Sequence, residues 1–324
     1  MIIDMNLMRV LLLLIIVIFA QPVAAQLDTD FLESQTNLSI TPDFPRPGQL
    51  TNISFANYNS QLYGADIIWR LNGEVVADAS NQKEVEFIAG DLGDTDVVSV
   101  SVIRDSRVIQ SYSIDVRPTY VDIILEPQTR TPDFYKGRAS PSVGSQINAT
   151  VLVNNSKLLT GDYIYTWRIG NRVLEGGPIR GTNKVSFDTP RGSKSTLTVD
   201  VSDTNGNSVG RRAIYFRSSK PELVFYESNA LYGQSHTAIS DSLVLIGTAA
   251  TIIAEPYHLD IRTYNNPDVN EWEIDRNEQA NTNPNPYQIT IQKVSEGGTS
   301  NVSFHVRSTT EFLQGAQDSI QIVF

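Results

Sequence analysis

The sequence has no cysteine and only three histidines among its 324 residues. A chain without cysteine forms no disulfide, so its stability must come from apolar burial and backbone hydrogen bonds alone. The histidines, His236, His258 and His305, show no metal-ligand spacing, and no Gly-x-Ser-x-Gly elbow accompanies them. We therefore expect no enzymatic activity, no catalytic residue and no cofactor.

Positive charge is also scarce, since 36 Asp and Glu oppose 25 Lys and Arg and leave a net charge of -11. A surface of this sign repels a phosphate backbone, which makes nucleic acid a poor partner. Hydrophobic residues make up 40% of the chain, with 13 Tyr and 12 Phe. Together with frequent Val, Ile, Ser and Thr, this composition is typical of folded β-sheet and predicts little helix.

The N-terminus has the pattern of an export signal. Residues 1–9 are weakly positive, Val10–Ala20 is apolar and uncharged, and Val23–Ala25 supplies small residues before a cleavage site. We expect a signal peptide over residues 1–25, cleaved after Ala25. The alternative is a retained anchor, but the apolar run is shorter than the roughly 20 residues that a membrane span needs.

The remaining chain offers no second membrane attachment. No cysteine follows the apolar run, so lipid cannot be attached there, and Ser319–Phe324 is strand-like and not part of a second apolar stretch. The mature chain should therefore have no stable membrane span. We expect an exported protein, extracellular or at the cell surface, with the periplasm as an alternative. The lack of cysteine fits bacterial export better than an animal extracellular protein.

Three tryptophans, Trp69, Trp167 and Trp272, indicate an internal repeat. Each lies in a strand-like stretch and is followed, at nearly the same distance, by an alternating apolar run: 98–102, 197–201 and 302–306. Because the pattern repeats three times, each tryptophan should face the core of its own β-sandwich. The sequence predicts a flexible leader over 26–38 and three tandem domains over 39–118, 119–219 and 220–324.

A literal repeat supports this division. Thr41-Pro-Asp-Phe44 recurs as Thr131-Pro-Asp-Phe134 at the front of the second domain. The third domain keeps no such copy, although Leu231–Gln234 lies in the matching place, and is the divergent one. Short linkers, each with one proline, predict a semi-rigid rod.

The second domain resembles a known family. Tyr165-Thr-Trp-Arg-Ile-Gly-Asn171 and Ser195-Thr-Leu-Thr-Val-Asp-Val-Ser-Asp-Thr-Asn-Gly206 are similar to PKD-type and related Ig-like domains of bacterial and archaeal surface proteins. The Trp-Asp-Phe-Gly-Asp-Gly hallmark of the strict PKD type is missing, and the other two domains match less well. The resemblance implies Ig-like sandwiches that serve as spacers, adhesion modules or glycan-binding accessories.

Two functional hypotheses follow. The first is a non-enzymatic cell-surface or extracellular rod of Ig-like modules, serving as an adhesive or structural spacer or a binding scaffold, with cell-envelope or surface proteins as partners. The alternative is a carbohydrate-binding or enzyme-accessory module with a glycan as its ligand. Residues that a glycan could stack on are the loop tyrosines: Tyr58, Tyr63, Tyr226, Tyr232 and Tyr264.

The candidates for metal binding are few. Oxygen-bearing side chains could hold Ca²⁺ at a turn of the second domain or beside the third tryptophan, where Asp200, Asp203, Asn205, Asp268 and Glu271 lie. Turn chemistry and a charged outer strand face explain the same residues.

Self-association is a further possibility at the C-terminus. Residues 319–324 alternate like a strand, and an exposed edge strand can add to another chain. The expected partner in that case is a second copy.

Overall fold

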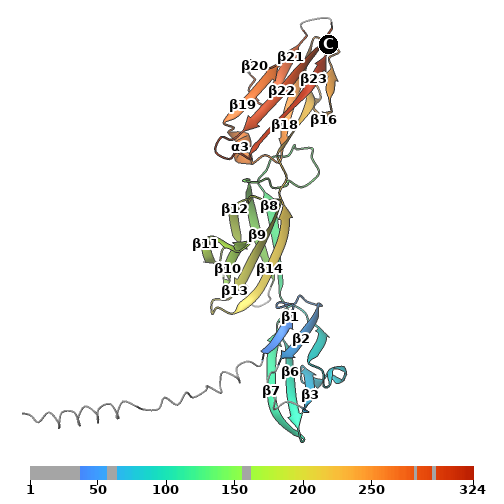
Figure 1. Cartoon of the computed structure of the whole chain (residues 1–324), viewed down its shortest axis with the longest axis vertical. Coiled ribbons are helices and arrows are strands. Elements are labelled where there is room, and N and C mark those ends of the chain that lie inside the picture. Colours follow the sequence, from blue (N-terminus) through green and yellow to red (C-terminus); the bar gives the residue numbers. More distant parts are fainter. Residues whose placement is uncertain (1–36, 57–63, 155–161, 281–282, 294–296) are drawn as a thin grey trace, which may run out of the picture. The chain divides into compact units, whose positions relative to one another are not determined.

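The computed structural model describes residues 37–56, 64–154, 162–280, 283–293 and 297–324 (Figure 1). Within these ranges the chain is nearly all β-strand, and the one α-helix, α3 (Ile261–Asn265), has five residues. Six sheets pack in pairs around three separate hydrophobic cores. The protein is therefore an all-β chain of tandem Ig-like sandwiches, as the sequence predicts.

The N-terminal predictions fall mostly outside the described residues. The predicted signal peptide (1–25) lies there entirely, as does most of the predicted leader (26–38). Strand β1 (Asn37–Thr41) includes the last two leader residues, because Leu38 packs against the first core together with Ile40. The leader prediction is wrong at these two positions. Among the described residues no helix has the length and hydropathy of a membrane span.

The first sandwich packs a three-stranded sheet, β1-β2-β5, against a four-stranded sheet, β4-β3-β6-β7, and every neighbouring pair is antiparallel. A 3₁₀ turn, Ala77–Ala79, follows β4. The strands after β1 are β2 (Leu50–Ala56), β3 (Asp66–Leu71), β4 (Glu74–Val75), β5 (Glu84–Ile88), β6 (Asp96–Arg104) and β7 (Arg107–Val116).

The second sandwich repeats this arrangement strand for strand, with sheets β12-β9-β8 and β11-β10-β13-β14. Its first strand, β8, corresponds to β1, so the two Thr-Pro-Asp-Phe segments occupy equivalent connections. The strands are β8 (Tyr120–Pro127), β9 (Gln146–Asn154), β10 (Ile164–Ile169), β11 (Arg172–Arg180), β12 (Lys184–Asp188), β13 (Lys194–Ser202) and β14 (Ser208–Arg217).

The third sandwich keeps the same plan and adds two strands, in the sheets β16-β15-β18-β21 and β17-β23-β22-β19-β20. The added strands, β16 and β17, lie in the connection between β15 and β18. The strands are β15 (Glu222–Asn229), β16 (Gly233–Ile239), β17 (Ser242–Val244), β18 (Ala249–Tyr257), β19 (Val269–Ile274), β20 (Asn277–Gln279), β21 (Gln288–Gln292), β22 (Thr299–Arg307) and β23 (Gly315–Val323).

The C-terminal strand is not the free edge that the sequence suggested. Strand β17 pairs in parallel with Gln321–Val323 of β23, so this part of the strand already has a partner on each side. The contact joins segments about 80 residues apart and follows no local pattern. Self-association by strand addition at 319–324 is therefore not supported.

Each tryptophan lies on an inner strand of the larger sheet of its sandwich. Trp69, Trp167 and Trp272 are 0%, 2% and 1% exposed. Strand alternation alone places them there, because the apolar residues of β6, β13 and β22 point to the same face. The tight turn after β3 uses Asn72 and Gly73, both with positive φ (51° and 89°).

The Cα positions divide the chain into two compact units. The first sandwich belongs to one unit, and the second and third sandwiches belong together in the other, which includes Arg117–Phe324. The division into three domains at 39–118, 119–219 and 220–324 therefore stays a prediction about independent folding.

Gly210 on β14 gives a test of the packing between the two sheets of the second sandwich. A Cβ at this residue would lie 2.6 Å from Cγ2 of Val121 on β8. Gly210→Ala should therefore lower the free energy of unfolding by about 1–3 kcal/mol, because the core has no room for the extra carbon. Thermal or urea unfolding measures this. Gly247→Ala is the control, since a Cβ there has no contact below 4.0 Å; equal effects of both substitutions would contradict the packing.

Candidate functional site

The second and third sandwiches meet at a polar contact that we call the joint. It is formed by the β8–β9 connection (128–145), the end of β18 with α3 (255–265), and the β22–β23 connection (308–314). The backbones themselves pair: Arg130 N donates to Leu259 O (2.6 Å), and Arg130 O accepts from His258 N (2.8 Å). Ile261 N donates to Gln128 O (3.0 Å). A short ladder thus links the two sandwiches directly.

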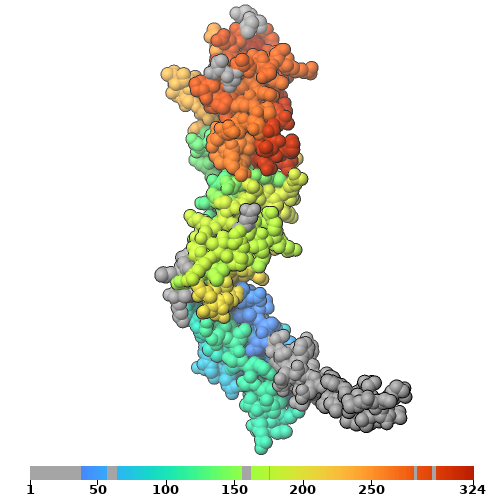
Figure 2. Space-filling view, turned by 90° about the vertical axis from the view of Figure 1, so that its left-hand side faces the viewer, coloured from blue at the N-terminus to red at the C-terminus, as the bar shows by residue number. Residues whose placement is uncertain are grey.

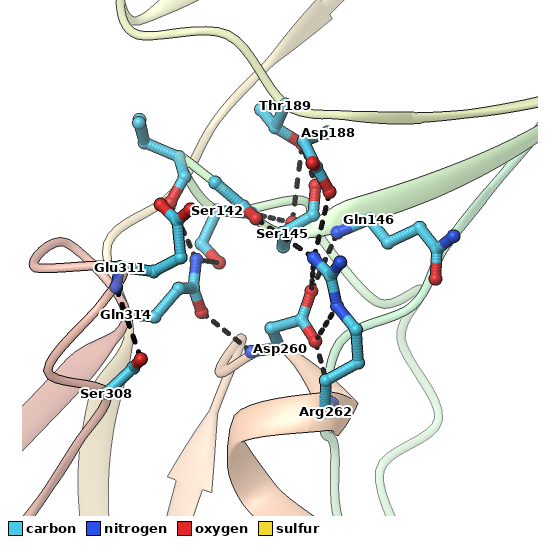
Figure 3. A network of polar contacts seen from close by, with 12 residues as sticks. Ser142, Ser145, Gln146, Asp188, Thr189, Asp260, Arg262, Ser308, Glu311 and Gln314 are labelled. Atoms are coloured by element: carbon cyan, nitrogen blue, oxygen red, sulfur yellow. Dashed lines mark hydrogen bonds and ion pairs between the residues drawn. The ribbon is translucent and has the colours of Figure 1, made fainter. Parts of the chain in front are cut away.

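Asp260 is the centre of the joint (Figure 3). Asp260 is 1% exposed, and its carboxylate accepts hydrogen bonds from the backbone N–H of Gln146 (2.7 Å) and of Arg262 (2.7 Å). The second bond caps the N-terminus of α3. Burial by itself raises the pKa of Asp260, but the bonds from Arg262 and Gln146 outweigh burial and lower the pKa overall. The carboxylate is therefore held ionised by groups from both sandwiches.

Arg262 extends this link to the second sandwich. Its guanidinium contacts Asp260 through Nε and Nη2 (2.9 Å each), and Nη2 also reaches Asp188 Oδ1 (2.9 Å) and Gly144 O (3.2 Å). Asp188 is at the end of β12, so one arginine of the third sandwich binds two separate segments of the second.

Gln314 makes a second buried bridge, also drawn in Figure 3. Gln314 is 1% exposed. Its side-chain Oε1 accepts a hydrogen bond from Asp260 N (2.8 Å), and its Nε2 donates to Ser142 Oγ (2.9 Å) and Val143 O (2.6 Å). Ser142 Oγ in turn donates to His258 O (2.6 Å). Both ends of the amide are used, so this network satisfies its buried groups.

A buried ion pair lies beside these bonds. Arg130 Nε is 2.6 Å from Oε1 of Glu255, whose side chain is 4% exposed. The Arg130 guanidinium also lies 4.9 Å from the centre of the Tyr264 ring. Because Glu255 without Arg130 would be an uncompensated charge inside the protein, the pair favours keeping the two sandwiches together.

The Thr-Pro-Asp-Phe segment of the second sandwich adds an aromatic contact to the joint through Phe134, whose ring we call the hook. The Phe134 ring stacks on His236 (4.5 Å between centroids) and meets the edge of Tyr226 (5.3 Å). Tyr135 packs edge-to-face on Tyr257 (5.5 Å). In Figure 2 the green β8–β9 connection lies directly against the orange third sandwich. The repeated motif thus acts as a contact segment in its second copy.

The structure corrects the choice of loop tyrosines. Tyr226 is 4% exposed, and its hydroxyl shares a 2.7 Å hydrogen bond with that of Tyr257, so it is not free for a ligand. Tyr264 stacks on Tyr287 at 4.5 Å and faces Arg130. Both rings are in contact with other residues of the joint or of the adjacent core, so they do not offer a free stacking surface. Tyr232 is 88% exposed, whereas Tyr58 and Tyr63 lie outside the described residues.

The Ca²⁺ candidates of the second sandwich have protein partners. Asp200 is bonded by both Arg168 and Arg211, so each carboxylate oxygen meets a guanidinium. Asp203 accepts from Asn207 and Asn205 within its own turn, and its side-chain bond from Asn207 is the main reason that its pKa is lowered. These bonds are those of an Asx turn.

The Ca²⁺ candidates of the third sandwich are Asp268 and Glu271. Asp268 accepts from Thr309 N (2.6 Å), the bond that most lowers its pKa, and from Ser308 Oγ (3.2 Å). Glu271 is on the outer face of β19, opposite His305. In the described part of the chain no group of three or more His, Cys, Asp or Glu is placed to hold a metal ion.

Sequence reasoning did not find the joint. Asp260, Arg262 and Gln314 lie in no recognised motif, and their partners in the second sandwich are more than 70 residues away. The Thr-Pro-Asp-Phe repeat at 131–134 lies in the joint, but in the sequence it indicated only the division into domains.

Asp260 tests whether the joint stabilises the fold. Asp260→Ala should lower the free energy of unfolding by about 2 kcal/mol, because it removes the N-cap of α3 and leaves the buried backbone N–H of Gln146 without its acceptor. Chemical denaturation of the full chain measures this. Asp318→Ala is the matched control, since Asp318 is exposed and bonds only to the next residue; a loss no larger than that of the control would refute the role.

His258 should make the joint sensitive to mild acid. Burial lowers the pKa of this imidazole, an effect that Glu222 partly opposes, and Nδ1 accepts from Ser140 N (3.4 Å). The unfolded chain therefore binds the proton more tightly than the folded chain, so stability is full above about pH 6.5 and falls as the pH drops below it.

The matched variant for this prediction is His258→Asn, because asparagine tolerates the positive φ of 60° found here. Unfolding measured between about pH 5 and 7 should show a smaller slope in the variant than in the native protein. Identical slopes would mean that His258 does not titrate differently on folding.

Comparison with known proteins gives a fold-level similarity only. No family model matches the sequence, and no curated protein does. The structure is similar to fibronectin(III)-like modules of Clostridium thermocellum CbhA, with 13% identity, 63% of this chain and 93% of that chain covered, and a TM-score of 0.23.

Two further solved structures cover more of the chain. The central fibronectin-III array of RIM-binding protein is 11% identical over 89% of this chain and 96% of that chain, with a TM-score of 0.29. Bacteroides ovatus SGBP-B, in complex with a mixed-linkage heptasaccharide, is 12% identical over 89% and 70%, with a TM-score of 0.24. At these scores the fold assignment rests on the strand pairings and cores of this chain itself.

Proposed function

We propose that this protein is an exported, non-enzymatic scaffold of tandem Ig-like and PKD-like sandwiches that acts as a structural or adhesive spacer at a bacterial cell surface. In this proposal the second and third sandwiches form one stiff element, and the ligand or partner is bound on surfaces that this element displays. The single observation that carries it is the joint centred on Asp260.

The joint supports the proposal because flexible linkage is the ordinary expectation between domains. Here a buried carboxylate, a buried amide and a buried ion pair each draw partners from both sandwiches. A hinge motion would separate Glu255 from Arg130 and would take the Gln146 N–H bond from Asp260, which is costly for buried carboxylates. A spacer needs this resistance to bending, whereas an enzyme would need a convergent reactive cluster.

Calorimetry of the full chain tests the proposal. If the joint couples the sandwiches, the second and third should unfold in one shared transition, and the first sandwich in another. The double variant Phe134→Ala, Gln314→Ala removes the hook and the amide bridge while leaving the three cores intact, so the shared transition should split into two. A shared transition in the variant, or two separate ones in the native chain, would contradict the stiff element.

The export part of the proposal has its own test. The protein purified from its source should begin at Gln26 by N-terminal sequencing, because Val23–Ala25 precedes the expected cleavage site. Labelling of intact cells with a reagent that does not cross membranes should modify it. An unprocessed N-terminus together with protection from the reagent would overturn the surface location.

The alternative function, carbohydrate binding, is favoured by one observation. Tyr232, at the β15–β16 turn, is 88% exposed, and an exposed aromatic ring offers a stacking surface. Tyr232→Ala should then abolish binding to a polysaccharide identified on a glycan array. Tyr120→Ala is the control, since Tyr120 is 37% exposed and lies on a different sandwich. If the native chain binds no glycan, the carbohydrate-binding alternative is wrong and only the spacer function remains.

A further inference from the structure

The second sandwich has a basic face on an otherwise acidic protein. The outward side chains of β10, β13 and β14 include four cations and one carboxylate, which are Arg168, Lys194, Arg211, Arg217 and Asp200. They point away from the core because Leu197, Val199 and Val201 occupy the inward positions of β13. The whole chain has a net charge of -11, so the charge of this face is opposite in sign to that of the protein as a whole.

The arginines on this face are held in position. Asp200 binds both Arg168 and Arg211, which fixes two guanidinium groups across three neighbouring strands. Tyr215 lies on the same face, opposite Thr196, and is 83% exposed. An ordered set of cations around an exposed aromatic ring has the composition of a protein-binding surface.

The equivalent face of the third sandwich is acidic. Its outward side chains on β19 and β20 include Glu271, Glu273 and Glu278, with Arg307 on β22 as the cation beside them. Trp272 and Phe304 occupy the inward positions, so these glutamates face away from the core. Glu271 and Glu278 are exposed.

Each face contains like charges at directly paired positions. Lys194 is paired with Arg217 on the basic face, and Glu273 with Glu278 on the acidic face. Like charges opposite each other on neighbouring strands are destabilising. A surface of opposite charge laid on either face would relieve the repulsion, and the chain itself carries both surfaces.

We propose that the basic face of the second sandwich binds the acidic face of the third sandwich in a second copy of this chain. The contact is between two sheet faces of opposite charge, with Tyr215 as its apolar anchor. At physiological salt the Debye length is about 8 Å, so the overall negative charge of each copy is largely screened while the facing charges are not. The proposal does not depend on where the protein is located.

The size of the contact sets its strength. Four strands about 4.8 Å apart and six residues long at about 3.3 Å each make a face of roughly 400 Å². One such contact buries roughly 800 Å² in total, which is below the about 1,200 Å² of stable complexes. The association should therefore be reversible and depend on protein concentration.

Sedimentation velocity of the full chain over a range of concentrations tests the proposal. The native protein should self-associate, and the apparent Kd should rise at least about tenfold between 0.1 and 1 M salt, as the Debye length falls from about 10 to about 3 Å. A native chain that stays monomeric at every concentration, or associates equally at both salt levels, would overturn it.

Charge reversal then locates the contact. Lys194→Glu with Arg217→Glu should abolish association, as should Glu273→Lys with Glu278→Lys. Combining all four substitutions in one chain should restore it, because the two faces exchange signs. Lys184→Glu with Arg107→Glu changes the net charge by the same amount as the first pair, on exposed residues elsewhere, and should leave association unchanged.

Unchanged thermal unfolding shows that the variants are folded, since all four positions are on the sheet surface. Failure of the fourfold variant to associate would count against the proposed pairing even if each double variant is monomeric. If the native chain is monomeric and the first double variant only loses binding to an anionic polysaccharide such as polygalacturonate, a glycan occupies the basic face and the proposal is wrong.

Discussion

The buried carboxylate of Asp260 constrains how the second and third sandwiches can be arranged. A charge removed from water is tolerated only when hydrogen bonds and counter-charges replace the lost hydration. For Asp260 these come from Arg262 in its own sandwich and from the Gln146 amide of the neighbouring one. Arg262 supplies the counter-charge from within the third sandwich, and the backbone N–H of Gln146 supplies one further bond that only the second sandwich offers, so the two sandwiches share one buried charge.

The other contacts of the joint follow from this constraint. Once α3 is capped by Asp260, Arg262 is directed toward Asp188, and the loop that carries Gln314 closes over Ser142. The Phe134 ring adds an aromatic contact to this polar centre. A stiff pair of sandwiches can present its outer sheet faces at fixed positions, which is what both a spacer and the proposed copy-to-copy contact require.

Much of the fold could be predicted because a strand has a period of two residues. The alternation around Trp69, Trp167 and Trp272 identifies the inner faces without any knowledge of partners. Contacts between segments distant in sequence could not be predicted in this way. The pairing of β17 with β23 overturned the expected free edge, and the ring contacts of Tyr226 and Tyr264 at the joint removed two expected ligand-binding tyrosines.

The sequence by itself determined the all-β class, the repeat of sandwiches and the inner face of each tryptophan strand, because these depend on local alternation and turn residues. The tertiary structure alone decided which polar groups are compensated and which charges share a face. Asp260, Gln314 and Arg130 read as ordinary loop residues until their partners are placed around them. Burial and electrostatic compensation depend on neighbours in space, and a sequence lists only neighbours along the chain.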